Sequence, residues 1–239
     1  MQYMDLAAIY DGFMYDMPYE KWAEFILKKL GRCDTLLELG SGTGNMTARL
    51  SMRYDVTALD ISEEMLDIAG TKLMKSGRSA RLVSGDMRSV TLHKPCENAV
   101  CVCDGINYLL DEKSVKDAFL NVARNIVQGG KFIFDISSRQ KLLKMNDQLY
   151  SEDRDEGAYI WRNSFDGDVI TMDITFFVPK KNGLFRRFDE EHKQRAHEES
   201  EISRWLGECG FRVISITDDY SDEPVTENTQ RITFVAEKI

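Results

Sequence analysis

Three glycines occupy alternate positions directly after a short apolar run, in the stretch ELGSGTGNM from Glu38 to Met46. Glycine is needed where a chain turns sharply from a strand into a helix and a ligand must approach the backbone itself. Twenty positions beyond Gly40, Asp60 ends a second apolar run, VTALD, where a carboxylate accepts hydrogen bonds from ribose hydroxyls. This spacing predicts a site for a ligand that contains a nucleoside.

Two kinds of nucleoside ligand compete for such a loop. A dinucleotide site requires G-x-G-x-x-G, whereas this loop reads G-x-G-x-G, and Asn45 stands where the last glycine would fall if the first were Gly40. Glu38, just before the loop, would repel a pyrophosphate but suits a ligand with an ammonium and a sulfonium. S-adenosylmethionine (SAM) has both groups and no phosphate. The loop therefore favours SAM as the cofactor, with an NAD dehydrogenase as the alternative.

The elements that must position this loop are visible as alternating patterns through the first 138 residues. Strands are predicted at 35–39, 56–60, 80–84, 99–103 and 131–136, and helices before Gly31, from about Asn45, after Ser62 and from Ser114. Strands that read as continuous apolar runs indicate a parallel sheet covered on both faces. We predict an α/β fold, a doubly wound, mostly parallel Rossmann-like sheet with an antiparallel last strand.

Between residues 139 and 197 the sequence is first highly charged and then alternates as antiparallel strands do. Asp166-Gly167 and Asn182-Gly183 separate strand-like runs, and such dipeptides are strong hairpin signals. We predict an inserted antiparallel β subdomain at 139–197. The SAM-binding domain would comprise 1–138, with an N-terminal helical lid, and 198–239, where a helix ended by Gly210 precedes two last strands.

Three segments follow one another at the predicted strand ends: LLELGSGTGNMT, VTALDISEEML and LVSGDMRSV. They resemble the first three cofactor motifs of the class I SAM-dependent methyltransferases, over roughly residues 33–136 and the terminal helix and strands. The segment HKQRAH resembles the H-x-Q-R segment of bacterial small-molecule methyltransferases with an inserted antiparallel flap, including sugar N-methyltransferases. The resemblance implies methyl transfer from SAM to a small-molecule acceptor.

The resemblance also implies which residues hold the cofactor. The loop glycines would wrap the methionine part, Asp60 would bind the ribose, and Tyr10 would bond the methionine carboxylate. Residues after the second and third strands would enclose the adenine, although core packing is the alternative for Met65 and Met87. The residues predicted at the cofactor are Tyr10, Trp22, Glu38, Gly40, Gly42, Gly44, Asp60, Ile61, Met65, Asp86, Met87, Cys103 and Tyr108.

The fourth predicted strand ends where open α/β sheets expose ligands, so Cys103, Asp104, Asn107 and Tyr108 are expected near the sulfonium. Methyl transfer needs mainly alignment and a dry site, with a general base only when the acceptor is still protonated. Asp104 is the candidate base, and a helix cap or loop carboxylate is the alternative. The Asn/Asp-Pro-Pro-aromatic motif of amino-methylating DNA enzymes is absent, which argues against DNA base methylation.

Two further segments are candidates for the acceptor side. The N-terminal aromatic residues include Tyr15, which would line the acceptor site if the segment folds over the cofactor as in similar methyltransferases; plain helix packing is the alternative. His192 and Arg195, in HKQRAH, would reach the acceptor, and a solvated strand end is the alternative. Tyr15 and His192 are therefore candidate catalytic residues beside Asp104.

Composition narrows the class of partner. The 239 residues carry a formal net charge of −9, which makes nucleic acid an unlikely partner because phosphate binding relies on Lys and Arg. The five cysteines do not resemble a disulfide framework, so we predict a reducing, cytoplasmic location. Together with the three scattered histidines they fit no zinc-binding spacing, so we predict no metal. No apolar run approaches the length of a membrane span. The sequence leaves undecided whether the protein forms a homodimer.

The leading interpretation is an enzyme that moves a methyl group from SAM to a nitrogen or oxygen of a small metabolite. Methylation of RNA or protein is the second interpretation, and a contiguous basic face beside the pocket would favour it. A SAM-binding protein without turnover is the third, and an acceptor cavity open to the sulfonium carbon would argue against it.

Overall fold

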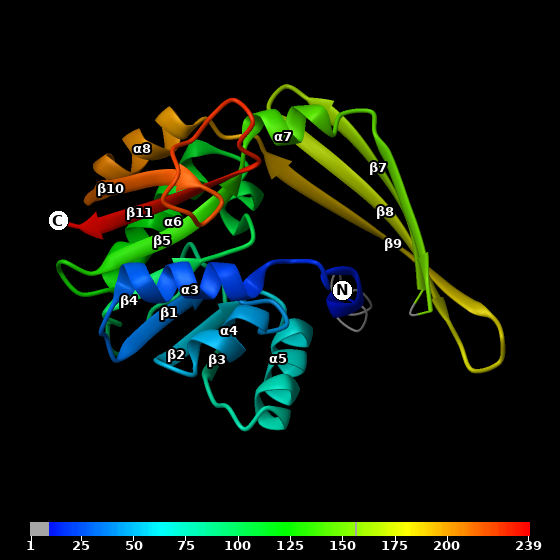
Figure 1. The fold of residues 1–239 in the computed structure, drawn as a ribbon, viewed down its shortest axis with the longest axis horizontal. Helices are drawn as coiled ribbons and strands as arrows, with labels where there is room; N and C mark the ends of the chain where they lie inside the picture. The colour runs from blue at the N-terminus through cyan, green and yellow to red at the C-terminus, as the bar shows by residue number, and fades with distance from the viewer. Residues whose placement is uncertain (1–9, 156) are drawn as a thin grey trace.

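A computed structural model describes residues 10–155 and 157–239. The body is a seven-stranded sheet in the order β10-β11-β5-β4-β1-β2-β3 (Figure 1). Its strands are β1 (Thr35–Leu39), β2 (Asp55–Asp60), β3 (Arg81–Ser84), β4 (Asn98–Cys101), β5 (Lys131–Ser137), β10 (Phe211–Asp218) and β11 (Arg231–Lys238). Neighbours among β1 to β5 are parallel, and β11 runs antiparallel to β5 and β10. The predicted fold class, with its antiparallel last strand, is confirmed.

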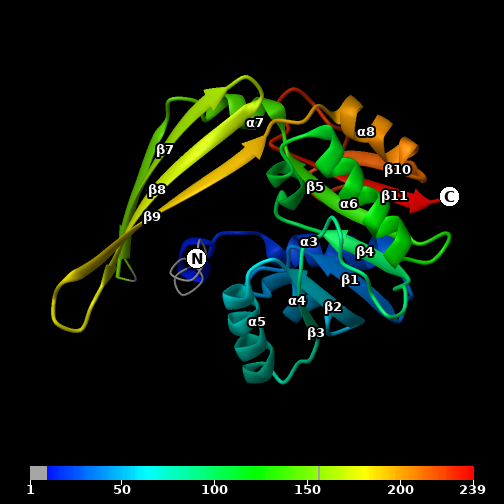
Figure 2. The same cartoon turned by 180° about the vertical axis from the view of Figure 1, so that it is seen from behind.

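Alternate side chains of the central strands enter two separate cores. On one face, Phe132 and Phe134 of β5 pack with the helices α6 (Glu112–Asn125) and α8 (Glu199–Glu208). On the other face, Ile133 packs with α3 (Tyr19–Leu30). The two helical layers appear in turn in the front and rear views (Figures 1 and 2). Burial on both faces is what made these strands readable as continuous apolar runs.

The remaining helices are α2 (Tyr10–Phe13), α4 (Asn45–Leu50), α5 (Glu63–Lys75), the 3-10 helix η1 (Gly105–Tyr108) and α7 (Arg139–Lys144). Ser62 caps α5, since its hydroxyl accepts a hydrogen bond from the amide of Met65 at 3.2 Å. Of the predicted N-terminal lid, α2 is the described part, and residues 1–9 lie outside the described residues.

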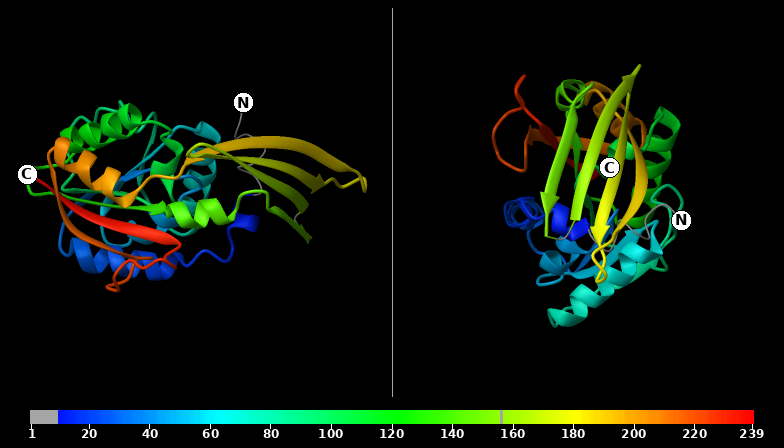
Figure 3. Two further views of the ribbon diagram at one scale, coloured as in Figure 1. Left: turned by 90° about the horizontal axis from the view of Figure 1, so that it is seen from above. Right: turned by 90° about the vertical axis from the view of Figure 1, so that its right-hand side faces the viewer.

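A second sheet leans away from the body like an arm (Figures 1 and 3). Its antiparallel strands, in the order β6-β7-β8-β9, are β6 (Leu149–Arg154), β7 (Gly157–Asp166), β8 (Val169–Pro179) and β9 (Phe185–Arg195). Both predicted hairpins are present, with Asp166 paired to Val169 and Pro179 to Phe185. The charged stretch after residue 138 contains α7 and β6, which the pattern did not single out because β6 is a largely exposed edge strand.

The fourth strand ends earlier than predicted, at Cys101 instead of Cys103. Cys103 and Asp104 adopt left-handed backbone conformations, with φ of 65° and 51°, which end the strand and lead into η1. This sharp turn brings the two residues into the site described below.

Candidate active site

The loop after β1 presents bare backbone to a cavity. Gly40, Gly42 and Gly44 have φ values of 63°, 53° and 76°, which glycine adopts without steric cost. Gly40 and Gly42 line the cavity, and a Cβ on Gly42 would meet nothing within 4 Å. Gly44, predicted at the cofactor, instead lies where α4 meets α5, since a Cβ there would be 2.8 Å from the Cβ of Ala69.

Asp60, at the end of β2, faces this loop from the neighbouring strand. Its carboxylate accepts hydrogen bonds from the amides of Gly42 at 2.7 Å and Ser62 at 2.9 Å. Burial raises the pKa of Asp60 above its ordinary value, although both backbone hydrogen bonds oppose that rise. Because β1 and β2 are parallel neighbours, their carboxyl ends meet at the edge where open α/β sheets bind ligands.

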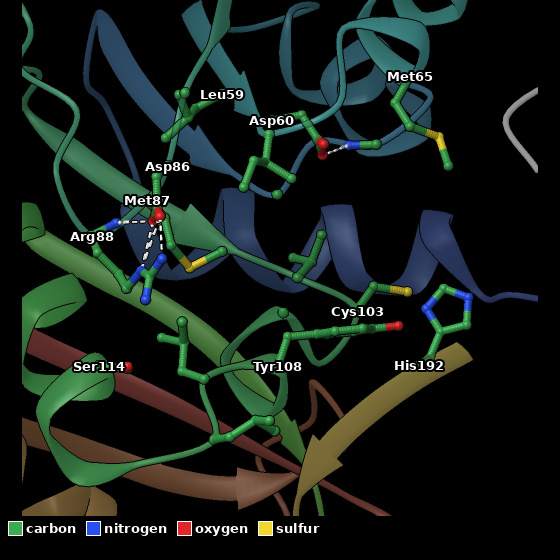
Figure 4. A pocket seen from close by; sticks show the side chains of 18 of the residues that line it. Leu59, Asp60, Met65, Asp86, Met87, Arg88, Cys103, Tyr108, Ser114 and His192 are labelled. Atoms are coloured by element: carbon green, nitrogen blue, oxygen red, sulfur yellow. Dashed lines mark hydrogen bonds and ion pairs between the residues drawn. The ribbon is translucent and has the colours of Figure 1, made fainter. Parts of the chain in front are cut away.

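A cavity of about 520 Å³ lies over these strand ends and is here named the loop cavity (Figure 4). Ile61 and Met65 line it after β2, and Asp86 and Met87 line it after β3. Arg88, which the sequence interpretation did not include, also lines it and donates through Nε to Asp86 at 3.0 Å. This hydrogen bond lowers the pKa of Asp86, so the carboxylate is already partnered and ionised.

Glu38 lies in β1 beneath the glycine loop and is fully buried. Neither carboxyl oxygen has a hydrogen-bond partner at ordinary geometry. Burial raises the pKa of Glu38 to about 8, with a smaller contribution from the charge of Asp60 and an opposing one from the Thr47 hydroxyl. Buried polar groups in proteins are nearly always hydrogen-bonded, so this carboxyl calls for an explanation.

A second cavity, of about 840 Å³, is here named the flap cavity because strands of the antiparallel sheet line one side. Tyr15, which follows α2, lines this cavity. Tyr150 of β6 and Trp161 of β7 also line it, and the centroids of their two rings lie 5.5 Å apart. Lys141 of α7 and Arg231 of β11 add two cations. The lining is therefore mainly apolar, with aromatic and aliphatic side chains and charged groups of both signs, as in small-molecule sites.

Four residues line both cavities: Tyr10, Cys103, Tyr108 and His192. They come from α2, the turn after β4, η1 and β9. The rings of Tyr108 and His192 meet edge to face with centroids 6.0 Å apart, and Figure 4 shows both beside Cys103. The two cavities therefore adjoin at the carboxyl end of β4.

The left-handed turn after β4 is fixed by hydrogen bonds to Asp135 of the neighbouring strand β5. The buried carboxylate of Asp135 accepts hydrogen bonds from the amides of Cys103 and Asp104, each at 2.8 Å. Tyr220 donates its hydroxyl to Asp135, and Arg231 forms ion pairs with Asp135 and Asp104. Left-handed non-glycine residues persist only where surrounding contacts fix them, and here one carboxylate fixes two in succession.

Asp104, the predicted candidate base, lines the flap cavity with both oxygens engaged. Arg231 donates to one at 3.0 Å and Gln194 to the other at 2.7 Å. Burial alone would raise the pKa of Asp104, but the charges of Arg231 and Lys141 and the Gln194 hydrogen bond outweigh it and lower the pKa. A general base works best with a pKa near the operating pH, so this geometry favours an electrostatic role over proton abstraction.

His192 combines a position at the junction with a neutral ring. It is buried on β9, and burial lowers the pKa of its imidazole below the ordinary value of 6.5. The ring is therefore uncharged at neutral pH and able to accept a proton. The alternative of a solvated strand end does not describe His192.

Three further predicted residues, like Glu38 and Gly44, line neither cavity. Trp22, predicted at the cofactor, is 1% exposed in the α3 core, where its indole N–H donates to Asp219 at 3.2 Å. Asn107 is buried, and its amide donates to the carbonyl of Arg195 at 2.8 Å, which ties η1 to β9. Arg195 pairs with Glu201 at 3.2 Å instead of lining either cavity.

Several residues of the site were missed in the sequence. Gln194 could have been predicted, because it is the glutamine of the H-x-Q-R segment. Asp135 interrupts the apolar run KFIFDI one residue before its end, near the edge where the other strands end, which is a usable signal. Arg231 opens the last strand about a hundred residues away, and no local pattern points to it.

Within 10–155 and 157–239, no group of three or more His, Cys, Asp or Glu side chains is placed to hold a metal ion. No helix in this part of the chain is long and apolar enough to cross a membrane.

Comparison with known proteins bears on the whole chain. A methyltransferase domain model matches residues 36–130. A relative from Geobacillus sp. (strain WCH70), named "Putative methyltransferase", is 32% identical over 248 residues that cover 100% of both chains. The crystal structure of an S-adenosylmethionine-dependent methyltransferase from Clostridium acetobutylicum ATCC 824 superposes with a TM-score of 0.91 at 34% identity, covering 99% of this chain and 98% of that one.

A more distant structure shares the fold with its cofactor in place. The SAM-bound amino pentose methyltransferase from Micromonospora echinaspora superposes with a TM-score of 0.77 at 19% identity, covering 97% of this chain and 95% of that one. The superposed part thus spans nearly the whole fold, including the antiparallel sheet. Because the likeness to the Geobacillus and Clostridium proteins extends along the entire sequence, the chain belongs to the class I SAM-dependent methyltransferases.

Proposed function

We propose that this SAM-dependent methyltransferase acts on a nitrogen or oxygen of a small molecule bound in the flap cavity. The observation that carries the proposal is the junction, because Tyr10, Cys103, Tyr108 and His192 line both cavities. SAM supplies an electrophilic methyl group on a sulfonium, so the protein's task is to align the acceptor and exclude water.

The loop cavity fits the donor. Gly40 and Gly42 offer backbone with open space above Gly42, and Asp60, which lines the same cavity, would accept hydrogen bonds from ribose hydroxyls. Ile61, Met65 and Met87 would border the adenine. The unpartnered carboxyl of Glu38 beneath the loop is explained by a cationic ligand above it, which would favour its ionised form.

The flap cavity fits a compact acceptor with an apolar or ring-shaped part. Its volume of about 840 Å³ lies within the range of small-molecule sites, and the paired rings of Tyr150 and Trp161 offer flat contact surface. The amino pentose methyltransferase with the same fold supports a small-molecule acceptor of this kind.

His192 is the proposed general base, and Asp104 the proposed electrostatic partner. A neutral imidazole at the junction can take the proton from an acceptor ammonium before the methyl group is transferred, or from an acceptor hydroxyl while it is transferred. Asp104 stays ionised and would favour a positively charged amine product. The proton leaves on His192 Nδ1 or Nε2, whichever faces the acceptor.

The proposal is tested by incubating the enzyme with labelled SAM and a metabolite extract, then identifying the labelled product. With that acceptor, His192→Asn should lower kcat by about 10²-fold or more and remove the fall in kcat/KM as the pH drops below 6.5. His93→Asn is the matched control, because His93 is exposed and outside both cavities. Label found only in protein or RNA, or an unaltered pH profile in His192→Asn, would contradict the proposal.

A further inference from the structure

Two large apolar side chains are exposed at the tip of the β8–β9 hairpin. Leu184 and Phe185 are 63% and 62% exposed. The turn is closed by hydrogen bonds from the amide of Lys180 to the carbonyl of Leu184 at 2.8 Å and from the amide of Gly183 to the carbonyl of Lys180 at 3.1 Å. The apolar pair is therefore displayed on a hydrogen-bonded turn.

Cations surround this apolar pair on both sides in the stretch KKNGLFRR, residues 180–187, which has no acidic residue. All four cations, Lys180, Lys181, Arg186 and Arg187, are exposed. Asp189 pairs with Arg187 at 2.9 Å, but both side chains are about 60% exposed and such pairs are weak. The tip is thus basic and apolar, although the chain as a whole carries a formal net charge of −9.

The hairpin carries this tip away from the acidic body. All three ribbon figures show the β8–β9 turn as the far end of the arm. β9 runs 11 residues from Phe185 to Arg195, which at about 3.3 Å per residue is roughly 36 Å. Charges separated by several Debye lengths of about 8 Å are screened at physiological salt, so the body's negative charge does not oppose an anionic partner at the tip.

The combination of side chains selects among anionic partners. Nucleic acid phosphates would engage the four cations and an unpaired base could stack on Phe185, but nucleic acid offers no apolar environment to Leu184. The acidic body of a second copy would likewise match the charge without covering the apolar pair. A bilayer surface with anionic lipids offers both, because headgroups meet the cations and the acyl boundary receives apolar side chains.

We propose that the β8–β9 tip binds the surface of anionic lipid bilayers. Leu184 and Phe185 enter the boundary between headgroups and acyl chains, and the flanking lysines and arginines engage lipid phosphates. The contact is peripheral and reversible, because two apolar side chains bury little area. It does not depend on which acceptor the enzyme methylates.

The test is co-sedimentation of the full chain with phosphatidylcholine vesicles, with and without phosphatidylglycerol. Wild type should bind the anionic vesicles, bind the neutral ones far less, and dissociate as salt is raised. Leu184→Ser/Phe185→Ser should lower the partition coefficient about tenfold or more. Lys180→Glu/Lys181→Glu should lower it comparably, and the defect should be largest at low salt.

Matched controls distinguish insertion of the tip residues into the bilayer from nonspecific hydrophobic adsorption of the protein. Met52→Ser/Met74→Ser removes two apolar side chains of 63% and 74% exposure from the body and should leave vesicle binding unchanged. Titration with S-adenosylhomocysteine should give wild-type affinity for both tip variants, which shows that they are folded.

Five outcomes would overturn the proposal. They are absence of wild-type binding to anionic vesicles, equal binding to neutral ones, or full binding by Leu184→Ser/Phe185→Ser. The fourth is a change in oligomeric state, measured by light scattering, as the sole effect of the tip variants, which would assign the tip to contact between copies. Binding to RNA that depends on Lys180 and Lys181 but not on the apolar pair would assign it to nucleic acid instead.

Discussion

The loop cavity and the flap cavity meet at one junction but are assembled differently. The loop cavity is built largely from three consecutive strand ends and uses backbone at Gly40 and Gly42 together with one buried carboxylate, Asp60. The flap cavity draws side chains from α2, α7, the antiparallel sheet and β11, segments that span most of the chain.

Under the proposed function, this difference follows from what each cavity would recognise. A donor common to a whole family is held by local geometry, in which glycine conformation and strand ends leave little freedom. An acceptor is recognised by side chains, and these are contributed by whichever segments the fold brings together. Variants in the two regions should therefore fail in different ways.

The largest effect is expected at the base of the junction. Arg231→Gln leaves the buried carboxylates of Asp104 and Asp135 without their cation, so we expect a loss of about 3–5 kcal/mol in the free energy of unfolding. Denaturant unfolding measures this loss. Arg212→Gln, which breaks an exposed pair with Glu237, is the control and should cost less than about 1 kcal/mol. Equal losses of unfolding free energy in the two variants would show that Arg231 is not needed to neutralise Asp104 and Asp135.

A smaller loss is expected in the glycine loop. Gly44→Ala places a Cβ 2.8 Å from that of Ala69 in a left-handed conformation, and strain plus overpacking should lower stability by about 2–4 kcal/mol. Gly167→Ala, at φ of 59° with open space around it, isolates the strain alone and should cost about 1–2 kcal/mol. If both substitutions cost the same in thermal unfolding, the close contact of α4 with α5 is unimportant.

The smallest and most specific effect concerns Glu38. Its pKa of about 8 keeps the carboxyl protonated at neutral pH, and the ammonium that S-adenosylhomocysteine shares with SAM should favour its ionisation when bound above it. Binding of S-adenosylhomocysteine at pH 7 should therefore release up to one proton, measured by calorimetry in buffers of different ionisation enthalpy. Glu38→Gln should bind without this release.

The same raised pKa has a consequence for stability. The stabilising contribution of neutral Glu38 is fully present below the unfolded-state value of 4.5 and is lost as the pH rises through 8. Glu38→Gln should flatten this dependence in unfolding measurements between pH 5 and pH 8. A wild-type slope retained in the variant would show that another group titrates.

The sequence predicted the fold class and the loop cavity well, because both depend on local patterns. Continuous apolar strands and alternate glycines are visible within a few residues, and Ile61, Met65 and Met87 follow from strand ends. The edge strand β6 was missed because exposure on both faces removes the apolar alternation.

Side chains whose partners are distant in the sequence were less predictable, for a physical reason. Trp22, predicted at the cofactor, lies in the α3 core, and an aromatic helix residue looks the same in sequence whether it faces a ligand or a core. Arg231 was missed because its partners, Asp104 and Asp135, come together only in the tertiary fold. The division into a domain of 1–138 and 198–239 and a subdomain of 139–197 stays a prediction.

The most direct test of the account is calorimetric titration of wild type and Asp60→Ala with S-adenosylhomocysteine and with its 2′,3′-dideoxy analogue. We predict that the substitution weakens binding of the parent ligand by about 1–3 kcal/mol through lost ribose hydrogen bonds. The analogue, which lacks the hydroxyls, should lose much less. Unchanged affinity for S-adenosylhomocysteine in Asp60→Ala would contradict the placement of the donor over the first two strand ends.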